Sequence, residues 1–187
     1  MDAFNYLSVL LSIIIGLGMT QVLTAIGRII RQRHAVVFYW VPAVWANLLL
    51  LIYVQSWWAM FGLREHRAWQ FTDFLIVLLQ AVTLYMMAAV VLPETIADDA
   101  VDLRAHYRNQ RRWFFGFFLA TLVVSVAKDL ILAGAWPSGM NLGFHAVFAA
   151  IALIAIVSRR DRMHESLALL SGAVFATYVA VLFARLR

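Results

Sequence analysis

The sequence predicts an all-α integral membrane protein, a single transmembrane domain over residues 1–187 formed by a bundle of six transmembrane helices. The chain is 64% hydrophobic with a mean hydropathy of +0.84, its apolar residues form six long runs, and nearly all of its arginines lie between those runs. An α-helix needs about 20 residues to cross roughly 30 Å of hydrocarbon, where a continuous helix satisfies its own backbone hydrogen bonds. The predicted helices cover about residues 4–30, 37–62, 71–92, 113–134, 141–158 and 166–184.

The first run has no lysine or arginine before it and is too long for the apolar core of a signal peptide, so we expect it to remain as the first helix. Small side chains recur in it at every fourth position, which makes one helical face where another backbone can approach closely. Helix packing is the first interpretation of this face, and ligand lining beside Gln21 is the alternative. The stripe consists of Ser8, Ser12, Gly16, Thr20 and Thr24.

The ends of the next helices have recognisable signals. Pro42 lies early enough in the second run to fit the first turns of a helix, and Pro93 with Glu94 ends the third. The long connection that follows places acidic residues before basic ones and sets Leu103 and Tyr107 on one face. We expect a short interfacial cytoplasmic helix at about residues 95–110. A solvated connector is the first interpretation of this helix, and a docking site for a partner is the alternative.

The arginines predict the orientation of the bundle. Ten of the fourteen lie in the first, third and fifth connections, and the positive-inside rule places these connections in the cytoplasm and both termini outside it. The formal charge of +5 comes from basic residues that flank apolar spans, a pattern that favours lipid headgroups over nucleic acid as the partner. The preference for arginine over lysine leads us to expect a bacterial inner membrane.

Several kinds of chemistry are excluded or disfavoured. The chain has no cysteine, which excludes disulfides, iron–sulfur clusters, thiolate zinc sites and thiol catalysis. His164 and Glu165 lack the second histidine of a zinc-protease helix, and among the histidines only His145 lies inside a predicted span, so haem ligation by two histidines is not expected. We expect no metal and no cofactor. No catalytic motif is present, although an enzyme of lipid chemistry stays open as a third class.

Six polar residues inside the spans are the candidate ligand- or ion-binding site. Each is costly in hydrocarbon unless it faces the bundle interior or water, so we expect these side chains to point inward. Lys128 is the only lysine of the chain, and with Asp129 it interrupts the fourth span about 22 Å from Trp113, in the outer half of the bilayer. The candidate residues are Asn47, Gln55, Gln80, Lys128, Asp129 and His145.

Lys128 and Asp129 are adjacent, so their side chains point about 100° apart on a helix and should not simply pair with each other. Their structural interpretation is that each makes interhelical bonds that fix the packing. Their functional interpretation is a site for an ion, a proton or a small solute in a cavity open to the outside. An ionisable group within a membrane is a functional candidate by default.

Two hypotheses for function follow from these patterns. The first is a channel or transporter whose polar site lies in the outer half of the bundle. The second is a non-catalytic interaction or sensor subunit that docks a cytoplasmic protein through its basic connections. In either case we expect a homo-oligomer embedded in the lipid bilayer. The arginines that would contact a protein partner or lipid headgroups are Arg108, Arg111, Arg112, Arg159 and Arg160.

Overall fold

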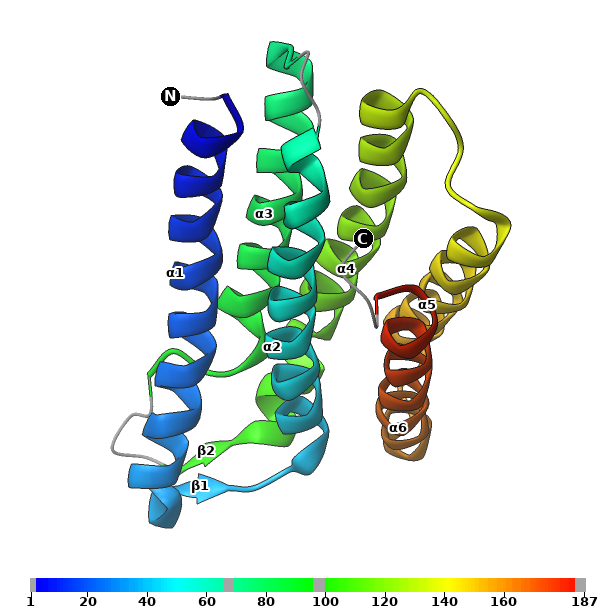
Figure 1. Ribbon diagram of the computed structural model, residues 1–187. Helices are drawn as coiled ribbons and strands as arrows, with labels where there is room; N and C mark the ends of the chain where they lie inside the picture. The colour runs from blue at the N-terminus through cyan, green and yellow to red at the C-terminus, as the bar shows by residue number, and fades with distance from the viewer. Residues whose placement is uncertain (1–2, 66–68, 96–99, 184–187) are drawn as a thin grey trace.

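The computed structural model describes residues 3–65, 69–95 and 100–183, and nearly all of them are helical (Figure 1). Within this part of the chain six helices are long and apolar enough to cross a membrane, which confirms the predicted number. They are α1 (Ala3–Arg31), α2 (Trp40–Met60), α3 (Phe71–Val91), α4 (Leu103–Ala133), α5 (Gly139–Val157) and α6 (Asp161–Tyr178). The shorter elements are η1 (Arg33–Ala35), β1 (Val36–Val37), η2 (Phe61–Glu65), β2 (Val101–Asp102) and η3 (Val179–Phe183).

The fourth helix differs from the expectation of a separate interfacial helix over residues 95–110. Residues 103–110 are instead the first turns of α4, and residues 96–99 lie outside the described part of the chain. Asp102 begins the helix because its carboxylate accepts hydrogen bonds from the backbone N–H groups of Arg104 (2.7 Å) and Ala105 (3.3 Å). With 31 residues, α4 is about 46 Å long, so its first turns extend beyond a hydrocarbon core of about 30 Å.

The helices form two groups (Figure 1). α3 packs against both α1 and α4, with α2 in front of it, and the α5–α6 hairpin lies on the far side of α2 and α4 from α1. The connections that follow α1, α3 and α5 lie at one end, which we call the arginine-rich end; the connections that follow α2 and α4 lie at the opposite end. At the arginine-rich end β1 and β2 pair in parallel, which ties the α1–α2 connection to the α3–α4 connection.

An aromatic cluster fills the bundle toward the arginine-rich end. Trp45 of α2 is buried and meets the rings of Phe114, Phe115 and Phe118 of α4 edge to face, with ring centroids 5.6, 5.0 and 6.1 Å away. Such pairs are worth about 0.5–1.5 kcal/mol beyond the area they bury. The cluster therefore holds α2 and α4 together in this half of the bundle.

Polar contacts fasten the α5–α6 hairpin to α4 at the arginine-rich end. The Arg108 guanidinium donates to the Asp161 carboxylate at 2.7 Å. Next to this pair the Tyr107 hydroxyl lies 2.9 Å from His164 Nδ1, and His164 Nε2 lies 3.1 Å from the Ser158 carbonyl oxygen. Because a carbonyl only accepts, Nε2 carries the proton of neutral His164 and Nδ1 accepts from Tyr107. We call the Tyr107–His164 and Arg108–Asp161 contacts the clasp.

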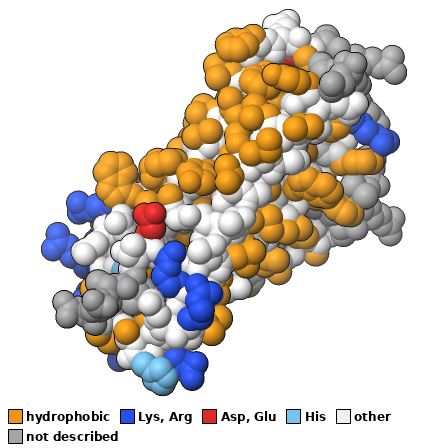
Figure 2. All heavy atoms as spheres, turned by 90° about the vertical axis from the view of Figure 1, so that its left-hand side faces the viewer, with side chains coloured by type: hydrophobic (Ala, Val, Ile, Leu, Met, Phe, Trp, Pro, Cys, Tyr) orange, Lys and Arg blue, Asp and Glu red, His pale blue; other side chains and the backbone are white. Residues whose placement is uncertain are grey.

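The surface has the pattern of a protein embedded in lipid. Figure 2 shows the α1 side, where hydrophobic side chains cover most of the length and basic side chains gather mainly at one end. On α1 the exposed apolar side chains include Val9, Ile13, Leu17, Leu23 and Ile30. A soluble monomer rarely exposes so continuous an apolar surface.

The predicted small-residue stripe of α1 lies mostly on this exposed surface. Ser12, Gly16, Thr20 and Thr24 are exposed, and Ser8 is half-buried. The stripe therefore does not hold the helices of one chain together, and its contact with a second chain stays a prediction.

The close approach on α1 occurs instead at Gly18, on the opposite face of the helix. The hydroxyl of Tyr53 of α2 lies where a Cβ of residue 18 would stand, whereas a Cβ at Gly16 would meet no atom within 4 Å. Tyr53 is fully buried, so its ring has little room to move away. Gly18 is thus required by the packing of α1 on α2.

We expect Gly18→Ala to lower the stability of the purified protein by about 1–3 kcal/mol, because the added methyl group overpacks the Tyr53 contact. Gly16→Ala is the matched control, with the same change made in open space on the other face of the helix, and it should leave stability unchanged or slightly raised. Thermal unfolding in one detergent measures both variants. Equal melting temperatures for the two would show that Gly18 is not a packing constraint.

Candidate functional site

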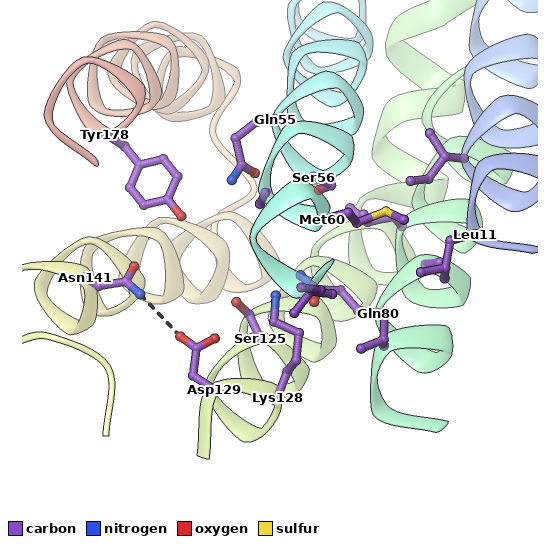
Figure 3. Close-up of a pocket in the computed structure, with 16 residues that line it drawn as sticks. Leu11, Gln55, Ser56, Met60, Gln80, Ser125, Lys128, Asp129, Asn141 and Tyr178 are labelled. Carbon is purple, nitrogen blue, oxygen red and sulfur yellow. Dashed lines mark hydrogen bonds between the residues drawn. The ribbon is translucent and has the colours of Figure 1, made fainter. Parts of the chain in front are cut away.

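A polar cavity lies within the bundle near the opposite end, between α2, α3, α4 and the α5–α6 hairpin (Figure 3). Its volume is about 120 Å³, which has room for several waters or one small solute, since one water needs about 15 Å³ by the same measure. Apolar residues of α1, α2 and α3 close one side of it. Its polar lining comes from Gln55, Ser56, Gln80, Ser125, Lys128, Asp129, Asn141 and Tyr178.

Lys128 and Asp129 of α4 both line this cavity, about one and a half turns before the helix ends at Ala133. Figure 3 shows Asp129 turned toward α5, while Lys128 points away from it toward the end of α2. Among the described residues no ion pair joins Lys128 to a carboxylate. The cavity therefore presents a cationic and an anionic group side by side without pairing them.

The α4–α5 connection positions the partner of Asp129. Gly134 ends α4 with φ of +63°, a conformation that glycine adopts without strain, and the Ser138 hydroxyl accepts from the backbone N–H of Asn141 to begin α5. The first turn of α5 thereby faces α4. Asn141 Nδ2 lies 3.5 Å from Asp129 Oδ2, and Asn141 Oδ1 is buried with no hydrogen-bond partner among the described residues.

A second cavity of about 70 Å³ adjoins the first and contains His145. Gln55, Gln80 and Ser125 line both cavities, so the two are neighbouring parts of one polar region. His145 Nδ1 lies 2.9 Å from the Asn141 carbonyl oxygen. Since that oxygen only accepts, Nδ1 carries the proton of the neutral ring, and Nε2 is an acceptor.

The structure thus brings together five of the six residues that the sequence singled out as a ligand or ion site. Gln55, Gln80, Lys128 and Asp129 line the first cavity, and His145 lines the second with the two glutamines. Asn47 is the exception. It is exposed on α2, and its Nδ2 donates to the Ala43 carbonyl oxygen at 2.8 Å within its own helix.

The structure adds residues that sequence reasoning did not select. Asn141 sits in the first turn of α5 next to a connection, where an amide usually contacts water, and only the fold shows that it faces Asp129. Tyr178 lies at the end of α6, where the sequence pattern would assign an aromatic residue to the interfacial belt. In the structure Tyr178 lines both cavities. Ser125 differs from these two, because its position one turn before Asp129 in the fourth span already predicted an inward side chain.

The five arginines predicted to contact a partner or headgroups divide into two groups. Arg108 is bound to Asp161 in the clasp, and Arg111 is buried. Arg112, Arg159 and Arg160 are exposed at the arginine-rich end. The last three therefore offer free surface to a protein or a lipid headgroup.

The side chains that line the polar cavity do not form a set that favours a metal ion. Among the described residues no three histidine, aspartate or glutamate side chains gather closely enough to hold a metal ion. The polar cavity offers one carboxylate, amides, hydroxyls and an ammonium group. Such a set suits a polar or dipolar organic group, or an ion that keeps part of its hydration.

Comparison with protein-family models, with curated proteins and with solved structures finds no match for this chain.

The exposure of the polar cavity to water is testable because the chain contains no native cysteine. We expect Ser125→Cys to react with a small water-soluble thiol reagent, since alkylation needs the hydrated thiolate. Asn47→Cys is the control on the exposed side of α2, where we expect lipid to cover the thiol, and it should react at least tenfold more slowly. Labelling in membranes measures both rates. Equal rates would show that the cavity does not admit water.

Proposed function

We propose that this protein is a membrane channel or transporter that binds a small ion or polar solute in the polar cavity. One observation carries the proposal: Lys128 and Asp129, oppositely charged neighbours inside a predicted span, line the same cavity without forming an ion pair with each other. Insertion scales assign about 2.5–3.5 kcal/mol to a charge at the centre of the bilayer, and the cost is smaller in the outer half, where these two residues are expected to lie. Two such charges are still unfavourable in a purely structural role, because apolar residues of similar size would pack the same helices without that cost.

The polar region supplies the groups that such a site needs. Asp129 would bind or relay a cation, with Asn141 holding its carboxylate in place. Lys128 would attract an anionic group or a carbonyl oxygen, and the amides of Gln55 and Gln80 would replace part of the hydration shell of the solute.

The packing supports access from one side at a time. Toward the arginine-rich end the bundle is filled by the Trp45 aromatic cluster, and the cavity lies on the other side of it, near the opposite end. The clasp holds the α5–α6 hairpin at the arginine-rich end, and the longer Asn141–Asp129 contact of 3.5 Å joins it to α4 at the opposite end. A rocking of this hairpin about the clasp would open or close the cavity, the kind of motion that alternating access requires.

We also propose that the opposite end faces away from the cytoplasm of a bacterial inner membrane, as the distribution of arginine indicates. Ser138→Cys and Ser158→Cys place single thiols in the α4–α5 and α5–α6 connections. In intact spheroplasts a membrane-impermeant thiol reagent should label residue 138 and leave residue 158 unlabelled until the membrane is opened. The reverse pattern would invert the orientation.

The transport proposal predicts the effect of Asp129→Asn in proteoliposomes under H⁺, Na⁺, K⁺ or Cl⁻ gradients. We expect flux in the native protein and at least a tenfold reduction in the variant, because the neutral amide no longer binds a cation. Asn47→Ala, a polar change on α2 outside the cavity, is the matched control and should keep native flux. Native flux in a folded Asp129→Asn variant would contradict the cation-binding role proposed for Asp129.

The docking-subunit hypothesis makes the opposite prediction. If the protein acts by binding a cytoplasmic partner, neutralising the exposed Arg112, Arg159 and Arg160 should abolish its cellular activity, and Asp129→Asn should leave it unchanged. The buried Arg111 and the paired Arg108 are unsuitable for this test, because their loss would also disturb the packing.

A further inference from the structure

An apolar groove runs along the outside of the bundle between α2 and α6. Its volume is about 490 Å³, and it is lined by residues between Leu48 and Trp58 of α2 and between Gly172 of α6 and Ala180 of η3. Apart from the amide of Gln55, the described residues that line it are apolar or aromatic. In a bilayer this groove faces lipid chains.

The groove adjoins the polar region. Gln55 lines the groove and both polar cavities, and Phe175 lines the groove and the cavity that contains His145. An amphipathic molecule in the groove would therefore have its polar part within reach of the polar cavity. The other apolar groove, of about 510 Å³ between α5 and α6, shares no lining residue with either cavity.

The length and level of the groove fit one leaflet of a bilayer. Leu48 and Trp58 are ten helical steps apart, or about 15 Å, which is half of a hydrocarbon core of about 30 Å. All of the α2 residues that line the groove except Leu48 belong to the half of α2 that ends beside the cavity. A lipid with its headgroup at the level of Lys128 and Asp129 would extend its chain down the groove toward the bilayer centre.

The side chains of α6 make room for such a chain. No atom lies within 4 Å of the place where a Cβ of Gly172 would stand, and Ala176 and Ala180 present small side chains to the same groove. The helix changes to a π-helix at Val179, which also lines the groove. Such π segments are frequent at functional sites.

We propose that the groove and the polar cavity together bind one phospholipid whose headgroup carries a phosphate and a primary ammonium. The phosphate would pair with Lys128. The ammonium would donate to the Asp129 carboxylate and to Asn141 Oδ1, the buried acceptor with no partner among the described residues. The inference rests on the cavity being the binding site of the proposed function, and it names the class of its ligand.

The same groups discriminate against other headgroups. A choline headgroup has no N–H to donate, so it would leave Asn141 Oδ1 unpaired. A glycerol headgroup has no positive charge, so it would place a net negative lipid beside the Asp129 carboxylate. The dipolar lining therefore favours the primary ammonium over both.

The test uses the purified full-length protein, stripped of lipid in detergent and mixed in turn with phosphatidylethanolamine, phosphatidylcholine and phosphatidylglycerol of identical acyl chains. Native mass spectrometry counts the lipids retained. We expect the native protein to retain one phosphatidylethanolamine with at least tenfold preference over the other two. Asp129→Asn should reduce this preference to less than threefold.

Two matched variants separate the groove from the general lipid surface. Gly172→Leu fills the α2–α6 groove, and Gly143→Leu places the same side chain in the α5–α6 groove, where the added Cβ also meets no atom within 4 Å. Phosphatidylethanolamine retention should fall at least tenfold in the first and stay native in the second. Equal retention of all three lipids, or equal retention by the two variants, would overturn the proposal.

Ion flux measured on the same preparations distinguishes this inference from the transport proposal. Flux that depends on Asp129, without any lipid preference, would overturn the lipid inference alone. A clear preference for phosphatidylethanolamine without ion flux would support the lipid inference and refute transport of small ions.

Discussion

Hydrocarbon does not solvate polar groups, and this constraint organises the interior of the protein. Each polar side chain within a span must bond to its own helix, as Asn47 does, or reach a shared polar space, as Gln55, Gln80, Lys128 and Asp129 do. The second solution requires several helices to turn their polar residues to the same level. The polar cavity is that meeting point, and its position near one end lets its charges stay close to water.

The asymmetry between the two ends of the bundle explains why the cavity forms where it does. At the arginine-rich end the clasp, the β1–β2 pairing and the aromatic cluster around Trp45 bring the helices together. At the opposite end the helices enclose the polar cavity, with Asp129 of α4 turned toward Asn141 of α5 (Figure 3). For the α5–α6 hairpin to pivot, it must be held at one end of the bundle and less closely packed at the other.

The polar cavity and the α2–α6 groove give the functional proposals a common physical basis. A cavity with one ammonium and one carboxylate group favours a dipolar ligand, and a groove that shares Gln55 with this cavity favours an apolar extension of that ligand. A small ion would use only the first feature, and a phospholipid would use both. The charged groups of α4 would bind either ligand, so the groove is the feature that distinguishes a phospholipid from a small ion.

The sequence by itself determined the six spans and the inward direction of most of their polar residues, because both follow from the cost of polar groups in hydrocarbon. It predicted neither the extension of α4 by the Asp102 cap nor the exposure of the α1 stripe, since an amphipathic pattern does not say which neighbour covers a face. The close packing at Gly18, the role of Asn141 and the continuity of groove and cavity through Gln55 were decided only by the tertiary structure. These features depend on how helices far apart in sequence are placed side by side, and local periodicity contains no information about that placement.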